Sequence, residues 1–330
     1  MKKIVWITTG GTIACTHHDD GLSPTLDSKQ MLEALGPYQN QAEILFDDLL
    51  QIDSTNMQPE EWGTIAQRMA KYIPHVDGII CTHGTDTLAY TASALSFMLE
   101  NVPIPIILTG SQLPLEDPLS DGYDNIRCAF AAAMSDLHGI YIAFNRKIML
   151  GTRTVKIKTM GFDAFESINE QAVGIINAKG LQINHQLMPK IKGEFKLHTH
   201  LCKKVQLIKL FPGMDPMIFD VLVNMGMRGI IIEAFGAGGI NFIRRDCIAK
   251  LERLSDAGIS VVVCSQCLYE NSDFSIYQVG QKALKHNVIQ SFDMTSEACV
   301  AKLMWALGIS QDPKDVKQLF EKNFANEIKI

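Results

Sequence analysis

Hydroxyl and carboxylate side chains crowd into the stretch CTHGTDTLAY, residues 81–90. Thr82, Thr85, Asp86 and Thr87 lie within six positions, directly after an apolar run and just before a helical pattern. Threonine is stiff and β-branched, so it is a poor filler for a tight turn. Helix capping by Asp86 or Thr87 is the alternative interpretation, but it accounts for only one of them. The cluster therefore indicates hydroxyls that face a site.

A second strand-end turn, ITTGGTIA, places Thr12 after Gly10 and Gly11. The two glycines permit unusual backbone angles and the close approach of a ligand. Neither phosphate-binding fingerprint, G-x-x-x-x-G-K-[ST] or G-x-G-x-x-G, follows them. A simple tight turn is the alternative. Because Thr85 also follows a glycine at the end of an expected strand, the pattern predicts that the hydroxyls of Thr12 and Thr85 face one pocket.

Two further clusters hold candidate polar residues. Ser54 and Thr55 lie in IDSTNMQPEEW, which also reads as a helix start because Pro and two Glu residues follow. Lys156 and Lys158 stand among apolar residues in GTRTVKIKTMGFDAF. A lysine directed inward can act as a base or orient other groups, whereas the alternative makes both of them solvated surface lysines.

Two patterns suggest chemistry that the rest of the sequence does not support. His198, His200 and Cys202 alternate and would share one strand face, but a fourth metal ligand is missing and the flanks are basic. Cys264 and Cys267 have C-x-x-C spacing without a second pair, which favours a structural role. No G-x-S-x-G motif is present, so an ordinary Ser-His-Asp hydrolase is not indicated.

The elements that position these clusters alternate between β-rich runs and helical stretches. Continuous Val, Ile and Leu strands separated by helices are typical of a mostly parallel sheet covered on both faces, in which ligands bind at the carboxyl ends of the strands. The first half predicts strands at 4–8, 76–82 and 104–109 and helices at 59–72, 88–99 and 125–134; the second half predicts strands at 229–232 and 258–264 and helices at 241–254 and 295–307.

Length and composition indicate a two-domain globular protein. The chain has 330 residues, of which 47% are hydrophobic and 20% charged, and this fits a soluble protein with a substantial core. Between residues 191 and 204 the pattern becomes charged, and LFPGMDP follows. We therefore predict a larger N-terminal α/β domain over residues 1–194 and a smaller C-terminal α/β domain over residues 208–330.

Charge and cysteine usage bear on partners and location. A net charge of −6 gives no general reason to expect binding to nucleic acid or to an anionic membrane. No apolar run reaches the roughly 18 residues that span a bilayer, and the short apolar segment after Met1 does not resemble a signal peptide. Eight cysteines scattered in apolar stretches are typical of a reducing compartment. We therefore expect a cytoplasmic location.

The combination of TTGGTIA and THGTDTLAYTASAL resembles the L-asparaginase family. The segments DSTNM, LTGSQLP, SDGYDN, GTRTVKIKTMGFDAF, FPGMDP and DMTSEA continue the likeness along essentially the whole chain, and they are similar to the bacterial type I, cytoplasmic asparaginases. The resemblance implies two α/β domains and a homodimer or homotetramer with the active site near a subunit interface. It also implies L-asparagine as substrate and no cofactor or metal.

The roles of the matching residues follow from the resemblance. It implies that Thr12 is the nucleophile, that Thr85, Asp86 and Lys156 complete the catalytic set, and that Ser54, Thr55, Thr85 and Asp86 bind the substrate. The implied reaction passes through a β-aspartyl ester on the enzyme. Two alternatives stay open at this point: Lys156 is either a base or an electrostatic orienter, and Thr85 is the other candidate nucleophile.

One position departs from the family pattern. Many members carry a tyrosine in a Gly-Tyr-x-Pro context after the first motif, whereas Leu22 occupies that place here. Ser23, Thr25 or a tyrosine elsewhere would then help to activate the nucleophile, or the first proton transfer is arranged differently. The sequence leaves open the preference between asparagine and glutamine, which differ by one methylene, and the presence of a regulatory asparagine site.

Two other functions compete with amide hydrolysis of free asparagine. The first is a glutaminase, either a glutaminase-asparaginase or the asparaginase-like component of an amidotransferase; such components generally have an extra domain before the first motif, which begins at residue 8 here. The second is a non-catalytic amino-acid sensor. The presence of Thr12, Thr85, Asp86 and Lys156 together disfavours the sensor, because a binder needs no nucleophile.

Overall fold

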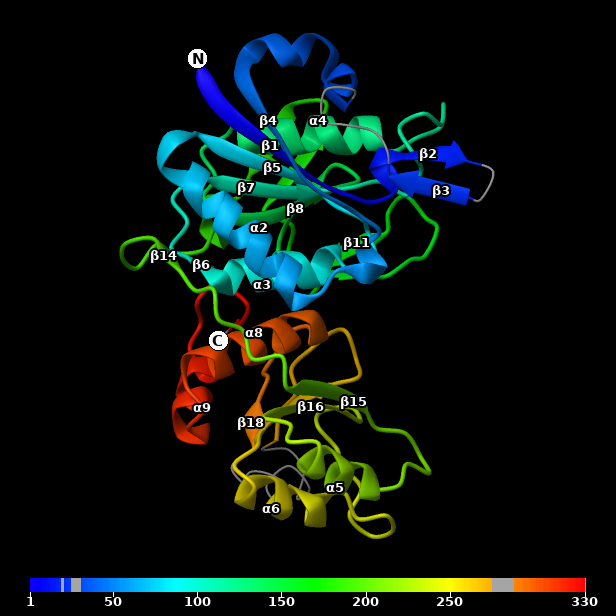
Figure 1. The fold of residues 1–330 in the computed structure, drawn as a ribbon, viewed down its shortest axis with the longest axis vertical. Helices are drawn as coiled ribbons and strands as arrows, with labels where there is room; N and C mark the ends of the chain where they lie inside the picture. Colours follow the sequence, from blue (N-terminus) through cyan, green and yellow to red (C-terminus); the bar gives the residue numbers. More distant parts are fainter. Residues whose placement is uncertain (19–20, 25–30, 275–287, 330) are drawn as a thin grey trace. The chain divides into compact units, whose positions relative to one another are not determined.

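The computed structural model describes residues 1–18, 21–24, 31–274 and 288–329, with the backbone alone described at 16–18 and 21–24. It divides the chain into two compact units, Met1–Thr199 and His200–Ile330. Each unit is an α/β domain with its own sheet and core (Figure 1). The predicted fold class is therefore confirmed.

The sheet of the first unit has eight strands in the order β13-β12-β9-β8-β7-β5-β1-β4. Five of them run parallel: β4 (Ala42–Ile52), β1 (Lys2–Gly10), β5 (Gly78–Thr82), β7 (Pro105–Thr109) and β8 (Gly139–Phe144). The other three run antiparallel to their neighbours: β9 (Lys147–Leu150), β12 (Gly174–Asn177) and β13 (Gly180–Ile183). The sheet is thus mixed, with its parallel part where the sequence predicts one.

Helices cover both faces of this sheet, as Figure 1 shows. The helices α2 (Pro59–Tyr72) and α3 (Leu88–Met98) lie on one face, and α4 (Gly122–Ala133) packs on the other with the 3-10 segment η2 (Glu33–Gln41). Central strands read as continuous apolar runs because both of their faces are buried: Ile4, Val5, Trp6 and Ile7 are each 0% exposed.

Short elements surround the sheet. They are the strand pairs β2 (Cys15–His18) with β3 (Gly21–Pro24), β10 (Thr154–Lys156) with β11 (Phe165–Ser167), and β14 (Lys196–Leu197) with β6 (Leu99–Glu100), and the 3-10 turns η1 (Thr12–Ala14), η3 (Ser54–Asn56), η4 (Ile73–His75) and η5 (His185–Leu187). Three of them, η1, η3 and β10, carry residues predicted to form the site.

The second unit has a four-stranded parallel sheet in the order β15 (Val205–Lys209), β16 (Gly229–Ala234), β17 (Ser260–Ser265) and β18 (Ile289–Gln290). The helices α5 (Met217–Asn224) and α6 (Ile248–Asp256) pack on one face through a core that includes Phe219, Leu251 and Val263. The helices α8 (Ser296–Ile309) and α9 (Pro313–Glu321) belong to the same unit, and α8 contacts β15, β16 and β17.

Two local predictions are wrong. The helix predicted from residue 241 begins at Ile248, because the side chain of Asn241 donates to the carbonyls of Arg244 and Arg245 and because Arg245 has a left-handed φ of 49°. The single strand predicted for LHTHLC is also absent, since β14 ends at Leu197.

Candidate active site

Two glycine turns lie against each other at the carboxyl ends of adjacent parallel strands. The strands β1 and β5 are neighbours, and Gly11 after β1 has a φ of 81°. A Cβ at Gly11 would overlap the Cα and N atoms of Gly84, so only glycine allows this approach. Thr12 and Thr85, which directly follow these two glycines, are therefore brought to the same point of the sheet edge.

A third turn, that of Ser54 after β4, joins the same point. A Cβ at Gly84 would come within 2.6 Å of the Ser54 Oγ, and that oxygen accepts from the Asp86 N–H at 3.3 Å. The Thr87 hydroxyl donates to the carbonyl of Ser54 at 2.8 Å. Thr87 occupies the N-cap position of α3 but its side chain makes no cap hydrogen bond. The hydroxyl thus ties two turns together, and capping does not explain it.

Lys156 connects Thr85 and Asp86. Its Nζ donates to the Thr85 Oγ1 at 2.8 Å and to an Asp86 carboxylate oxygen at 2.6 Å. Thr85 is 6% exposed and the Lys156 side chain 18%, whereas the Asp86 side chain is 56% exposed. One carboxylate oxygen of Asp86 is thus engaged by an ammonium from the protein, while the group as a whole stays open to a ligand. The neighbouring Lys158 instead pairs with Asp163 and is half exposed.

Gln112 completes the contacts of the Thr85 hydroxyl and was not assigned a role from the sequence. The Thr85 hydroxyl donates to the Gln112 Oε1 at 3.1 Å, and the Gln112 Nε2 donates to the carbonyl of Thr159 at 3.0 Å. The hydroxyl proton of Thr85 points to Gln112, so a lone pair of the Thr85 Oγ1 faces the Lys156 ammonium. The signal that could have identified Gln112 is its place after a fourth strand, β7.

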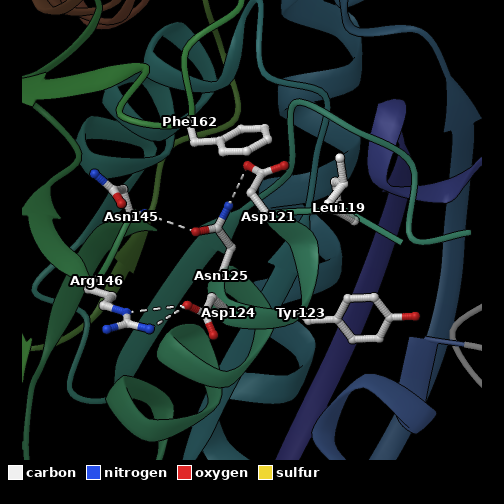
Figure 2. Close-up of a pocket in the computed structure, with 9 residues that line it drawn as sticks. Leu119, Asp121, Tyr123, Asp124, Asn125, Asn145, Arg146 and Phe162 are labelled. Carbon is white, nitrogen blue, oxygen red and sulfur yellow. Dashed lines mark hydrogen bonds and ion pairs between the residues drawn. The ribbon is translucent and has the colours of Figure 1, made fainter. Parts of the chain in front are cut away.

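Asp121 and Asn125 hold the turn that carries Gln112. A carboxylate oxygen of Asp121 accepts from the backbone N–H of Gln112 at 2.9 Å and of Leu113 at 3.2 Å, and burial raises the pKa of this carboxyl while those hydrogen bonds oppose the rise. Figure 2 shows Asn125 between Asp121 and Asn145, at the wall of a cavity of about 240 Å³. The cavity is therefore lined by Asp121 and Asn125, the two residues that hold the turn carrying Gln112.

The remaining predicted residues differ in their surroundings. Thr12 is half-buried in η1. Thr55 is exposed, and both its N–H and its hydroxyl donate to one oxygen of Asp53, at 2.8 and 2.9 Å. The backbone of Leu22 lies in β3, where it pairs with His17, and Thr25 lies outside the described residues. Ser54, Thr85, Asp86 and Lys156 are thus linked by direct contacts. Thr12 lies next to this group because Gly11 contacts Gly84, whereas Thr55 is hydrogen-bonded to Asp53.

The contact between Gly11 and Gly84 leads to a prediction. Replacing Gly11 with alanine is expected to cost about 1–3 kcal/mol because its backbone angles, φ 81° and ψ 175°, are essentially restricted to glycine, and about 1–3 kcal/mol more for overlap with Gly84. Gly180→Ala is the control for a positive φ without overlap, since Gly180 has a φ of 84° and no atom within 4 Å of the added Cβ. Thermal unfolding of both variants measures the difference. Equal destabilisation by the two changes would contradict the close contact.

The described residues were also compared with the requirements for a metal site, a membrane-spanning helix and a disulfide bond. Within those ranges, no group of three or more His, Cys, Asp and Glu side chains is arranged to hold a metal ion. No helix in the described part is both long and apolar enough to cross a membrane. All eight cysteines are free thiols, six of them buried, and Cys264 and Cys267 are not bonded to each other.

Family models match both units of the chain. A model described as "Asparaginase, N-terminal" matches residues 3–189, and one described as "Glutaminase/Asparaginase C-terminal domain" matches residues 204–320. Together they cover most of the 330 residues.

Individual relatives are similar over nearly the whole chain. An L-asparaginase of Thermococcus kodakarensis is 41% identical over 99% of both chains, and a solved structure of the thermostable L-asparaginase from that organism has a TM-score of 0.93 at 40% identity, also covering 99% of each. The structure of L-asparaginase I from Vibrio cholerae has a TM-score of 0.87 at 31% identity, covering 100% of this chain and 99% of that one. One component of the glutamyl-tRNA(Gln) amidotransferase of Pyrococcus furiosus is 34% identical over 99% of this chain and 77% of that protein.

Proposed function

Since the chain belongs to the asparaginase family, we propose that it is an L-asparaginase, which hydrolyses L-asparagine to L-aspartate and ammonia. The observation that carries the proposal is the contact of Lys156 with both Thr85 and Asp86, at the point where the Gly11 and Gly84 turns meet. A side-chain amide is a poor electrophile and a threonine hydroxyl a poor nucleophile, so the site must supply activation and charge stabilisation together.

In the first half of the proposed reaction, the Thr12 Oγ attacks the side-chain amide carbon of asparagine. The hydroxyl proton passes to the leaving nitrogen through Thr85 and Lys156, the C–N bond breaks, and ammonia departs. A β-aspartyl ester on Thr12 remains. In the second half, water held by Thr85 attacks this ester, and L-aspartate and the free Thr12 hydroxyl result.

The α-groups of the substrate call for opposite partners. We assign the substrate ammonium to Asp86, because this carboxylate is half exposed and has only one oxygen engaged by Lys156. We assign the α-carboxylate to the hydroxyl of Ser54, with Thr55 beside it. Ser54 is buried, and its oxygen accepts from the Asp86 N–H, which leaves the hydroxyl proton for the substrate.

Lys156 acts in this scheme from within an ion pair. Its ammonium donates to Thr85 and to Asp86 in the same arrangement, so it orients the Thr85 lone pair and brings positive charge close to the reacting hydroxyls. We therefore favour Lys156 as an electrostatic orienter whose proton can move along the bond to Thr85.

The function is tested by ammonia release from L-asparagine and from L-glutamine, measured side by side. The wild-type protein is expected to release ammonia from asparagine, and Thr12→Ala to lower kcat by a factor of about 10³ or more, since a covalent step is lost. Thr12→Ser, which keeps a hydroxyl, is the matched variant and should retain measurable turnover. Full activity in Thr12→Ala would place the nucleophile elsewhere, with Thr85 the next candidate.

The identity to an amidotransferase component supports one alternative, a glutaminase. A ratio of kcat/KM that favours glutamine in the same assay would select it. A folded wild-type protein that binds either amino acid without releasing ammonia would select the amino-acid sensor.

We also propose that the protein is a homodimer or homotetramer in the cytoplasm, as the resemblance to type I asparaginases implies. The apolar side chains of Leu119, Met160 and Phe162 are 77%, 85% and 44% exposed, close to the site, and this supports a covered surface there. Sedimentation equilibrium distinguishes the dimer, the tetramer and the monomer that would overturn the proposal.

A further inference from the structure

His83, between the end of β5 and Gly84, makes contacts that the proposed reaction leaves unexplained. Its side chain is fully buried, with Nδ1 2.7 Å from the carbonyl oxygen of Gly84 and Nε2 2.9 Å from the hydroxyl of Thr91 on α3. The Thr91 oxygen in turn accepts from the indole N–H of Trp62 on α2 at 3.0 Å. Two helices and a strand end are thus linked to one backbone carbonyl.

The partners determine which nitrogen of His83 carries the proton. A carbonyl oxygen only accepts, so Nδ1 must donate. Burial lowers the pKa of His83 to about 4, which keeps the ring neutral near pH 7 and leaves Nε2 as an acceptor. The Thr91 hydroxyl then donates to Nε2, and its oxygen is left to accept from Trp62. The chain of hydrogen bonds therefore has a single direction, from Trp62 through Thr91 and His83 to Gly84.

Holding the Gly84 carbonyl also orients the next N–H. The peptide bond between Gly84 and Thr85 is trans, so its C=O and N–H point in opposite directions within one rigid plane. With the carbonyl turned to His83, the Thr85 N–H points away from the imidazole. Among the residues that the structure describes, none accepts a hydrogen bond from this N–H, although Thr85 is 6% exposed. The Thr85 N–H is therefore a buried donor, close to the reacting hydroxyls, that can donate to a ligand oxygen as its partner.

We propose that His83 is a positioning residue, which fixes the Gly84–Thr85 peptide so that the Thr85 N–H stabilises the oxyanion formed when Thr12 attacks the amide. This inference rests on the proposed function. When the Thr12 Oγ bonds to the amide carbon, the carbonyl electron pair moves onto oxygen and the Thr85 N–H donates to it. When the C–N bond breaks, the pair returns and ammonia leaves. Because the donor is set before the reaction, no reorientation is needed in the transition state.

Two substitutions separate positioning from packing. In His83→Asn the amide nitrogen takes the place of Nδ1 and can still donate to Gly84, whereas in His83→Gln it takes the place of Nε2 and cannot. We expect kcat for asparagine to fall by about 10² in His83→Gln, the effect of a donor displaced by about 1 Å, with KM changed less than threefold. His83→Asn should keep kcat within about threefold of wild type.

The same pair of variants can overturn the inference. Asparagine leaves the larger void in place of the ring, so a role in packing alone predicts that His83→Asn is the worse variant. Equal losses of kcat, or a greater loss in His83→Asn, would rule out positioning. An independent readout is the ¹⁵N NMR signal of the His83 ring, which must show Nδ1 protonated at pH 7. An inactive wild type with this tautomer would reject the proposed function alone, whereas the opposite tautomer would reject the inference whatever the activity.

Discussion

Replacing Lys156 with methionine is expected to lower kcat/KM for L-asparagine by about 10²–10⁴, the range for loss of a group that takes part in proton transfer. Methionine keeps the length of the side chain but removes the ammonium from the Thr85 Oγ1, 2.8 Å away, and from Asp86, 2.6 Å away. Thr85 then loses the positive partner of its lone pair. The Asp86 carboxylate would remain half exposed and hydrated, so we expect KM to change less than kcat.

Lys158→Met is the control for this prediction, because it removes a lysine two positions along that pairs with Asp163 at the surface. A surface pair of this kind contributes at most about 1 kcal/mol, and kcat/KM should stay within threefold of wild type. Steady-state kinetics of ammonia release gives both values. Comparable losses of kcat/KM in the two variants would show that activity depends on the segment that contains both lysines and not on the Lys156 ammonium itself.

Replacing Lys302 with methionine is expected to destabilise the second unit by about 3–5 kcal/mol, the cost of leaving a buried charge without its partner. Lys302 on α8 and Glu327 are both 0% exposed, and their charged groups are 2.6 Å apart. The ammonium also donates to the carbonyls of Phe320 and Lys322, at 2.5 and 2.8 Å. Burial lowers the pKa of Lys302, and the Glu327 carboxylate opposes that shift. The interaction thus fastens the segment from Phe320 to Glu327 to α8.

The double variant Lys302→Met/Glu327→Gln tests the reason for the loss. Glutamine keeps an oxygen for the N–H groups of Phe324 and Ala325, which Glu327 accepts from, but removes the uncompensated charge. The double variant should therefore be more stable than Lys302→Met alone. Hydrogen exchange of peptides from α8 and α9 follows the second unit separately, because a two-domain chain need not unfold in one step. Protection unchanged in Lys302→Met would contradict the prediction.

The parallel core of the fold could be predicted because its strands are buried on both faces and its helices have clear ends. The helix α2 begins at Pro59 and ends at Tyr72 as the sequence indicates, with Pro at the first position and Glu61 accepting from the Gln58 N–H. The strands β9, β12 and β13 could not be predicted, because they are only four residues long and β12 and β13 are partly exposed. Their position depends on pairing in the sheet and not on local pattern.

The residues of the candidate site could be predicted where they lie in turns that follow strands. They could not be predicted where they act through hydrogen bonds to other parts of the fold. Thr12, Thr85 and Ser54 stand next to glycines or strand ends that the sequence marks. Gln112 and Asp121 do not stand out, because their importance comes from hydrogen bonds to Thr85 and to backbone N–H groups across the fold. His83 is likewise an ordinary residue in the sequence, and only its burial against Gly84 and Thr91 distinguishes it.

The meeting of the turns after β1, β4 and β5 also has a consequence for folding. Gly11, Ser54 and Gly84 are separated by tens of residues along the chain, and they touch only after β1 has paired with β4 on one side and β5 on the other. Contacts between distant segments form late, because closing long loops costs entropy before the contacts repay it. Thr12 and Thr85, which follow these glycines, are therefore brought to one edge of the sheet only when β1, β4 and β5 have all paired.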